Sequence, residues 1–153
     1  MLRQCVVCLF VLSLAGCMEG NKPEKDRLTR LPPPLYERLG KEEGIKKVVD
    51  DLVTAVIANR DYRQQHKRHF MDGDVAGLKK KLVDQIGEAT GGPQKYTGKN
   101  MKDAHKGLGV TDADFAALVA SLKTALDKNK VGEKEQKELF DLLGPMRKDV
   151  VEK

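Results

Sequence analysis

Apolar residues recur at the spacing of an amphipathic helix through most of the chain after residue 34. In the segment 41–59 they fall at positions i, i+3, i+4 and i+7, which places them on one helical face. The segments 75–90 and 111–126 and the stretch after Gly132 show the same period. No segment alternates with period two and no internal repeat is present. The pattern therefore predicts an all-α domain.

Local signals predict where the first of these helices begin and end. Residues 35–39 form a predicted short helix that stops at Gly40. The stretch 60–70 is dense in charge and is predicted to be a loop or a broken helix. Asp72 or Asp74 then caps the next helix, because a short polar side chain can accept from the free amides of the first turn.

The second half of the chain carries similar signals. Thr111 is a predicted N-cap, and Asp112 and Asp114 follow it in the first turn, where negative charge is favourable. Val131-Gly132 marks a turn. Pro145 predicts a kink or break near the middle of the last helix, since proline removes a backbone donor.

A glycine-rich stretch, residues 91–109, separates these two halves and contains a short predicted helix. Asn100 is a good N-cap and Gly107 a good C-cap, so the helix spans about two turns and carries His105 near its end. A short helix that presents one imidazole between longer helices suits a metal centre. A single His in such a helix is, however, more often a surface residue.

The amino terminus has the pattern of an export signal. Arg3 precedes an apolar run, residues 5–14, that is shorter than the about 20 residues needed to span a bilayer. Leu14-Ala15-Gly16-Cys17 resembles the bacterial lipobox, in which the Cys becomes the first mature residue and carries the lipid. We therefore expect residues 1–16 to be a lipoprotein signal peptide. An ordinary secretory signal or a buried N-terminal strand are the alternatives.

Domain organisation and localisation follow from this signal. Residues 17–34 are polar and Pro-rich, which is typical of a flexible tether, and residues 35–153 suffice for one domain. We expect an exported protein on the periplasmic side, lipid-anchored to a membrane through Cys17. Cys5 and Cys8 would leave with the signal, so the mature chain has no thiol free to form a disulfide.

Charge and composition narrow the picture further. The net charge of +5 is spread along the chain and indicates anionic surfaces or ligands rather than nucleic acid. The chain has no Trp and few aromatic residues, and its predicted helices are uneven in length. A large apolar ligand in the centre would explain the irregular helices, and loose native packing would explain them too.

Several motifs together resemble the group 1 truncated haemoglobins, small globins with a two-over-two helical sandwich. The resemblance runs from about Leu35 to Lys153. It rests on four segments that match at the expected spacing: Leu35-Tyr36-Glu37-Arg38-Leu39-Gly40, Val48-Val49-Asp50-Asp51, Gly91-Gly92-Pro93 with Tyr96-Thr97-Gly98, and Met101 to Thr111, with Phe115 continuing in register.

The resemblance implies a haem b cofactor and a set of residues around it. His105 would be the proximal ligand of the haem iron, imidazole being a common axial ligand. Phe70 falls where the family has a Phe that packs on the haem face, and Lys81 would meet a haem propionate. The implied haem-binding residues are His105, Phe70, Leu78, Lys81, Leu82, Tyr96, Met101 and Val53.

The distal side departs from the family pattern. Many members have Phe and Tyr where this chain has Leu52 and Val53, and Gln where it has Leu78 and Leu82. A pocket without a hydrogen-bond donor favours CO and NO relative to O2 and releases O2 faster.

Other side chains could change this distal pocket. Gln85 is the nearest amide, with an exposed helix position as the alternative. Tyr62 could partly replace the missing Tyr if its loop folds inward. His66 and His69 are expected to be solvated loop residues, with distal iron ligation as the other reading.

Three functions remain from the sequence. The first is a tethered haem protein that binds the diatomic gases O2, NO or CO, with a possible reductase partner. The second is an enzyme, an NO dioxygenase or a peroxidase-like protein, which would need a distal donor or acid–base group. The third is a haem-free helical adaptor, which leaves His105 and the Tyr96-Thr97-Gly98 loop without a purpose. We favour gas binding without catalysis.

Overall fold

The computed structural model describes residues 32–71 and 73–153. The expected signal peptide, residues 1–16, and most of the expected tether, residues 17–34, lie outside this part. The described residues fold into helices joined by loops, as predicted. In chain order the elements are α2 (Leu35–Arg38), α3 (Lys41–Ala58), α4 (Gln64–Met71), α5 (Val75–Ala89), α6 (Met101–His105), α7 (Asp112–Lys128), α8 (Glu133–Leu143), the 3-10 helix η1 (Gly144–Met146) and α9 (Arg147–Val150).

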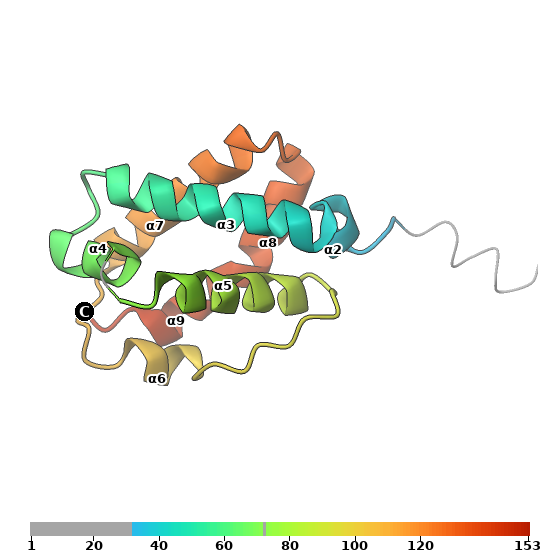
Figure 1. The fold of residues 1–153 in the computed structure, drawn as a ribbon. Coiled ribbons are helices and arrows are strands. Elements are labelled where there is room, and N and C mark those ends of the chain that lie inside the picture. Colours follow the sequence, from blue (N-terminus) through green and yellow to red (C-terminus); the bar gives the residue numbers. More distant parts are fainter. Residues whose placement is uncertain (1–31, 72) are drawn as a thin grey trace, which may run out of the picture. The chain divides into compact units, whose positions relative to one another are not determined.

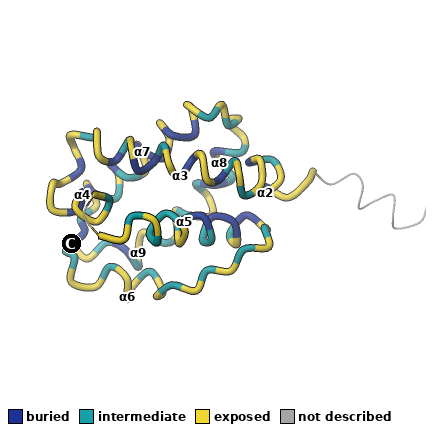
Figure 2. The backbone as a smooth tube through the Cα atoms, viewed as in Figure 1, coloured by how far each residue is buried: buried dark blue, intermediate teal, exposed yellow. Residues whose placement is uncertain are grey.

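Helix α3 is the centre of the fold. It packs against α7 and α5, and Figure 1 shows α3 and α5 side by side in front of α7 and α8. Its predicted apolar face is buried: Val56 and Val49 are 0% and 1% exposed, whereas Ile57 at the edge of the face is 37% exposed. The dark stretches of the tube in Figure 2 follow this face and the facing sides of α5 and α7. Burial of aliphatic side chains therefore stabilises the α3 contacts.

The predicted caps explain where α5, α6 and α7 begin. The Asp74 carboxylate accepts a hydrogen bond from the Gly77 amide at 2.8 Å. Thr111 and Asp114 form a reciprocal capping box at the start of α7, which satisfies two free amide groups of the first turn. Asn100 likewise accepts from the Asp103 amide and starts α6.

The charged stretch before Phe70 differs from its prediction in one respect. Its second part forms a regular helix, α4, and His66 within it is 3% exposed instead of solvated. The expectation of a solvated His66 is wrong because nearby residues and one residue of α7 surround its ring, with the Asp114 carboxylate 3.7 Å from its Nε2 atom. Arg63 lies 2.8 Å from its Nε2 atom, and Tyr62 packs against its ring. His69 is exposed, as expected.

Pro145 interrupts the last helical segment where the sequence predicts a break. α8 ends at Leu143, a single 3-10 turn contains the proline, and α9 follows. α9 packs against α6, and the C-terminus lies beside the loop between α6 and α7 (Figure 1). Within the described residues, every helix is too short or too polar to cross a bilayer.

Candidate functional site

A cavity of about 410 Å³ is enclosed by α3, α5, α6, α7 and the C-terminal segments α8, η1 and α9. This volume is within the range of about 300–1,000 Å³ typical of sites for organic ligands and cofactors. Its wall is mostly aliphatic and aromatic, with Gln85, His105 and Arg147 as its polar side chains. The lining residues are Leu52, Leu82, Gln85, Ile86, Met101, His105, Phe115, Leu118, Val119, Leu122, Phe140, Leu143, Gly144, Met146, Arg147 and Val150.

His105 is the last residue of α6, and its ring is held by the same helix. The Nδ1 atom lies 2.7 Å from the carbonyl oxygen of Met101. A carbonyl oxygen can only accept, so Nδ1 carries the hydrogen and Nε2 keeps its lone pair in the neutral ring. An imidazole whose second nitrogen is fixed in this way is prepared to coordinate a metal through Nε2.

Among the described residues that line this cavity, His105 is the one with an imidazole. Among the described residues, His, Cys, Asp and Glu do not gather in groups of three or more that could hold a metal ion. The apolar wall suits a cofactor with a large apolar surface, because its burial removes that surface from water.

The structure brings some of the predicted site residues together. Leu82 of α5, Met101 of α6 and His105 line the cavity, as does Leu52 of α3. Leu52 and Leu82 come from helices that pack on each other, and Leu82 and Ile86 flank the polar Gln85 on the α5 side of the wall.

Other predicted residues lie outside this wall. Val53 is buried on α3, Leu78 is half-buried on α5, and the Lys81 side chain is exposed. Phe70 packs edge-on against the Tyr62 ring, with ring centroids 6.0 Å apart. The Tyr96 hydroxyl donates to the Lys99 carbonyl at 2.8 Å and its ring lines a smaller neighbouring pocket. The roles expected for these five residues remain predictions.

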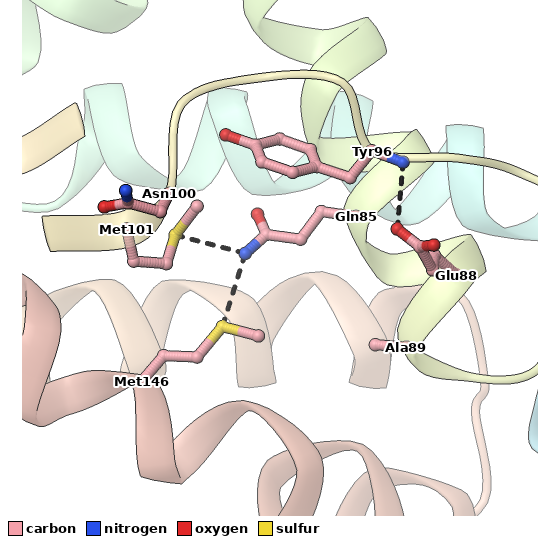
Figure 3. A pocket seen from close by; sticks show the side chains of 7 residues that line it. All are labelled: Gln85, Glu88, Ala89, Tyr96, Asn100, Met101 and Met146. Atoms are coloured by element: carbon pink, nitrogen blue, oxygen red, sulfur yellow. Dashed lines mark hydrogen bonds between the residues drawn. The ribbon is translucent and has the colours of Figure 1, made fainter. Parts of the chain in front are cut away.

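Gln85 lies between the main cavity and this smaller pocket of about 280 Å³. Its Nε2 atom donates to two thioether sulfurs, Met101 Sδ at 3.2 Å and Met146 Sδ at 3.3 Å, as Figure 3 shows. Sulfur is a weak acceptor, and these two contacts direct the hydrogens of the Gln85 amide toward Met101 and Met146. Gln85 is half-buried and not an exposed helix residue.

The C-terminal part of the wall was not predicted as a site. Phe140, Leu143, Met146, Arg147 and Val150 line the cavity. The signal for most of them was present, since the apolar period of the last segment continues across the break. It could equally have indicated a helix packed on its neighbours, because periodicity does not distinguish a side chain that faces a cavity from one that faces another helix.

A partly buried polar cluster joins the start of α4 to α7. The Arg63 guanidinium contacts both oxygens of the Asp114 carboxylate and holds the pKa of Asp114 far below its usual range. Burial lowers the pKa of His66, and Arg63 lowers it further, although Asp114 acts in the opposite direction. Burial also raises the pKa of Tyr62 to about 12. Tyr62, His66 and His69 are not among the described residues that line the cavity.

The chain is similar in sequence to known globins. The profile of the family described as bacterial-like globin matches residues 34–152. The group 1 truncated hemoglobin of Tetrahymena pyriformis is 30% identical over 122 residues, which cover 80% of this chain and 98% of that protein. The group 1 truncated hemoglobin GlbN of Mycolicibacterium paratuberculosis is 29% identical over 119 residues, 78% of this chain and 85% of that protein.

Solved structures agree with the sequence comparison. The crystal structure of the Tetrahymena pyriformis truncated hemoglobin in its Fe(III) form superposes with a TM-score of 0.70 at 30% identity, covering 78% of this chain and 99% of that one. The 2/2 hemoglobin of Synechococcus, in the cyanomet state with covalently attached heme, gives a TM-score of 0.67 at 27% identity, covering 77% and 98% of the two chains. The predicted two-over-two arrangement is confirmed by these similarities.

Proposed function

We propose that this chain, which belongs to the bacterial-like globin family, is a gas-binding protein with His105 as the iron ligand. Group 1 truncated haemoglobins of this family bind haem and, through it, diatomic gases. We also propose that the protein is tethered to a membrane outside the cytoplasm. Haem is its cofactor, and its iron supplies the coordination position at which a diatomic gas binds. The observation that carries the site assignment is the single His105 imidazole in the wall of a large apolar cavity, with Nδ1 held by the Met101 carbonyl.

The residues present fit a haem group. His105 offers one neutral nitrogen, which suits an iron whose other ligands come from the porphyrin. The apolar wall gives the ring system a dry environment and keeps water from the gas. Leu82 and Leu52 contribute to this wall from α5 and α3.

The character of the wall also supports a preference among gases. Leu52, Leu82 and Ile86 have no hydrogen-bond donor, and the Gln85 amide donates to two sulfur atoms. O2 gains more than CO from a neighbouring donor, so a wall of this kind favours CO and NO over O2. Reversible gas binding needs no acid–base group in the cavity, whereas peroxidase-like catalysis does.

The membrane tether rests on the sequence around Cys17, which lies outside the described residues. The apolar run before it, the small residues Ala15 and Gly16, and the polar Pro-rich segment after it form the order expected of an anchored lipoprotein. The globin domain would then bind its gas on the periplasmic side.

Absorption spectra of the haem-loaded protein and of His105→Gly test the site. The unaltered protein is expected to give a five-coordinate ferrous spectrum that changes on addition of CO. His105→Gly is expected to lose tight haem binding and to regain it when free imidazole fills the space left by the side chain. His69→Gly, which removes an exposed imidazole from α4, serves as the matched control and should behave like the parent.

Two results would contradict the assignment. Stoichiometric haem with an unchanged Soret band in His105→Gly would show that another residue holds the iron. A six-coordinate ferrous spectrum in the unaltered protein would show that a protein side chain occupies the gas position. Rapid NO consumption by the reduced protein in the presence of O2 would favour the dioxygenase alternative.

A further inference from the structure

The loop that follows His105 has an unusual backbone. Gly107 and Gly109 have φ angles of +80° and +64°, in the left-handed region that favours glycine. The residues between His105 and α7 therefore turn sharply, and the amides of both glycines face one acceptor. That acceptor is not part of the loop or of α6.

The acceptor is the carboxylate of Glu152, near the end of the chain. Its Oε1 atom accepts from the Gly107 amide at 2.7 Å and its Oε2 atom from the Gly109 amide at 2.5 Å. The Glu152 amide in turn donates to the Val110 carbonyl at 2.9 Å. Three hydrogen bonds thus join one residue beyond α9 to three residues of the loop, Gly107, Gly109 and Val110. Figure 1 shows the C-terminus beside this loop.

Arg63, the residue before α4, binds the same loop. Its Nη2 atom donates to the Gly109 carbonyl at 2.6 Å while the guanidinium also contacts the Asp114 carboxylate. Gly109 is therefore fixed through both its amide and its carbonyl group. A carboxylate that accepts from two backbone amides makes charge-assisted bonds, which are stronger than neutral ones.

We propose that Glu152 is a positioning residue, which fixes the loop after α6 and thereby the orientation of the His105 imidazole in the cavity. α6 has five residues, and a helix this short has little stability of its own, so contacts outside it must hold its end. Gly107 is two residues from His105, and the Leu108 amide donates to the His105 carbonyl at 3.1 Å. Loss of the carboxylate frees the loop and widens the range of ring orientations.

This inference rests on the proposed role of His105 as iron ligand, and the test separates the two. The probe is the stretching band between iron and the His105 nitrogen in the resonance Raman spectrum of the ferrous, haem-loaded protein. Glu152→Gln keeps the size of the side chain but loses the charge and one acceptor, and Glu152→Asp keeps the charge with a shorter reach. Glu37→Gln, at an exposed position on α2, is the matched control.

Glu152→Gln is expected to broaden and shift the iron–histidine band and to speed haem loss to a scavenging protein by about tenfold, the effect of about one charge-assisted bond. Glu152→Asp should lie between the parent and Glu152→Gln, and Glu37→Gln should match the parent. Because Glu152 lies beyond α9, the helix content of these variants should stay the same.

An unchanged band in Glu152→Gln overturns the positioning role, whether or not haem loss accelerates, because a purely structural tie would change stability without changing the ring. Failure of the proposed function looks different. In that case the band is missing from the unaltered protein, or it survives in His105→Gly.

Discussion

The side chain of Leu82 shows how one residue can set the chemistry of the gas site. It lines the same cavity as His105, at a position where the sequence resemblance implies a Gln in many relatives. An amide there would offer a hydrogen to bound O2, and an isobutyl group offers none. We therefore expect gas selectivity to depend on this position more than on the size of the cavity.

Leu82→Gln is predicted to slow O2 release by about fivefold, which corresponds to one added hydrogen bond of about 1 kcal/mol. CO release should change little, because CO gains less from the donor. Stopped-flow measurement of both dissociation rates on the haem-loaded protein gives the ratio. Leu82→Met, which keeps the site apolar and similar in volume, should leave both rates near those of the parent. Equal slowing of O2 and CO in Leu82→Gln would instead point to a steric barrier.

At the scale of elements, the junction between α4 and α7 depends on ionisable groups. Arg63 and Asp114 form an ion pair there with Asp114 1% exposed, and His66 lies against Arg63. Only the Asp114 side of the pair is buried, since the Arg63 side chain is 42% exposed. Removing Arg63 would therefore leave a buried carboxylate without its charged partner, which is costly. The junction therefore holds α4 in place as long as Asp114 is ionised and His66 is neutral.

The pH dependence of stability follows from the His66 pKa. Burial lowers this pKa from its ordinary value of 6.5, so between that value and the folded pKa the unfolded chain binds a proton that the folded chain does not. The free energy of unfolding should therefore fall as the pH drops below 6.5. Asp114, whose pKa is far below its usual range, stays ionised in the folded protein through this window.

Urea unfolding of the parent and of His66→Gln between pH 7 and pH 5 measures this effect. The variant should show a flatter curve than the parent, because its amide does not titrate. His69→Gln, at an exposed position on the same helix, should keep the slope of the parent. An identical slope in His66→Gln and the parent would show that His66 does not cause the dependence.

At the scale of the whole molecule, the question is where the globin domain resides. Cys17→Ser is predicted to move the protein from the membrane fraction to the soluble fraction of the exported protein, because serine cannot take the thioether-linked lipid. Immunoblotting of cell fractions measures the shift. Cys8→Ser, inside the expected signal peptide, is the control and should remain with the membrane. Membrane association that persists in Cys17→Ser would contradict lipid anchoring at this residue.

Much of the helical arrangement could be predicted, because its signals are local. Apolar spacing placed α3, α5 and α7, and the caps at Asp74, Asn100 and Thr111 set where helices begin. Those signals act within a few residues, so they hold whatever the rest of the chain does. The charge-rich stretch before Phe70 was less predictable, since its burial depends on Asp114 in another helix.

The sequence by itself determined the helical class, the caps and the break at Pro145, and its family motifs made His105 the predicted iron ligand. Only the tertiary structure decided what surrounds that residue. It brought α8, η1 and α9 to the cavity wall, buried His66, and placed the Glu152 carboxylate against Gly107 and Gly109. Helix period and capping depend on neighbours along the chain. A cavity wall, and a contact such as that of Glu152 with the loop after α6, depend on residues that meet across 40 or more positions. No local pattern records such contacts.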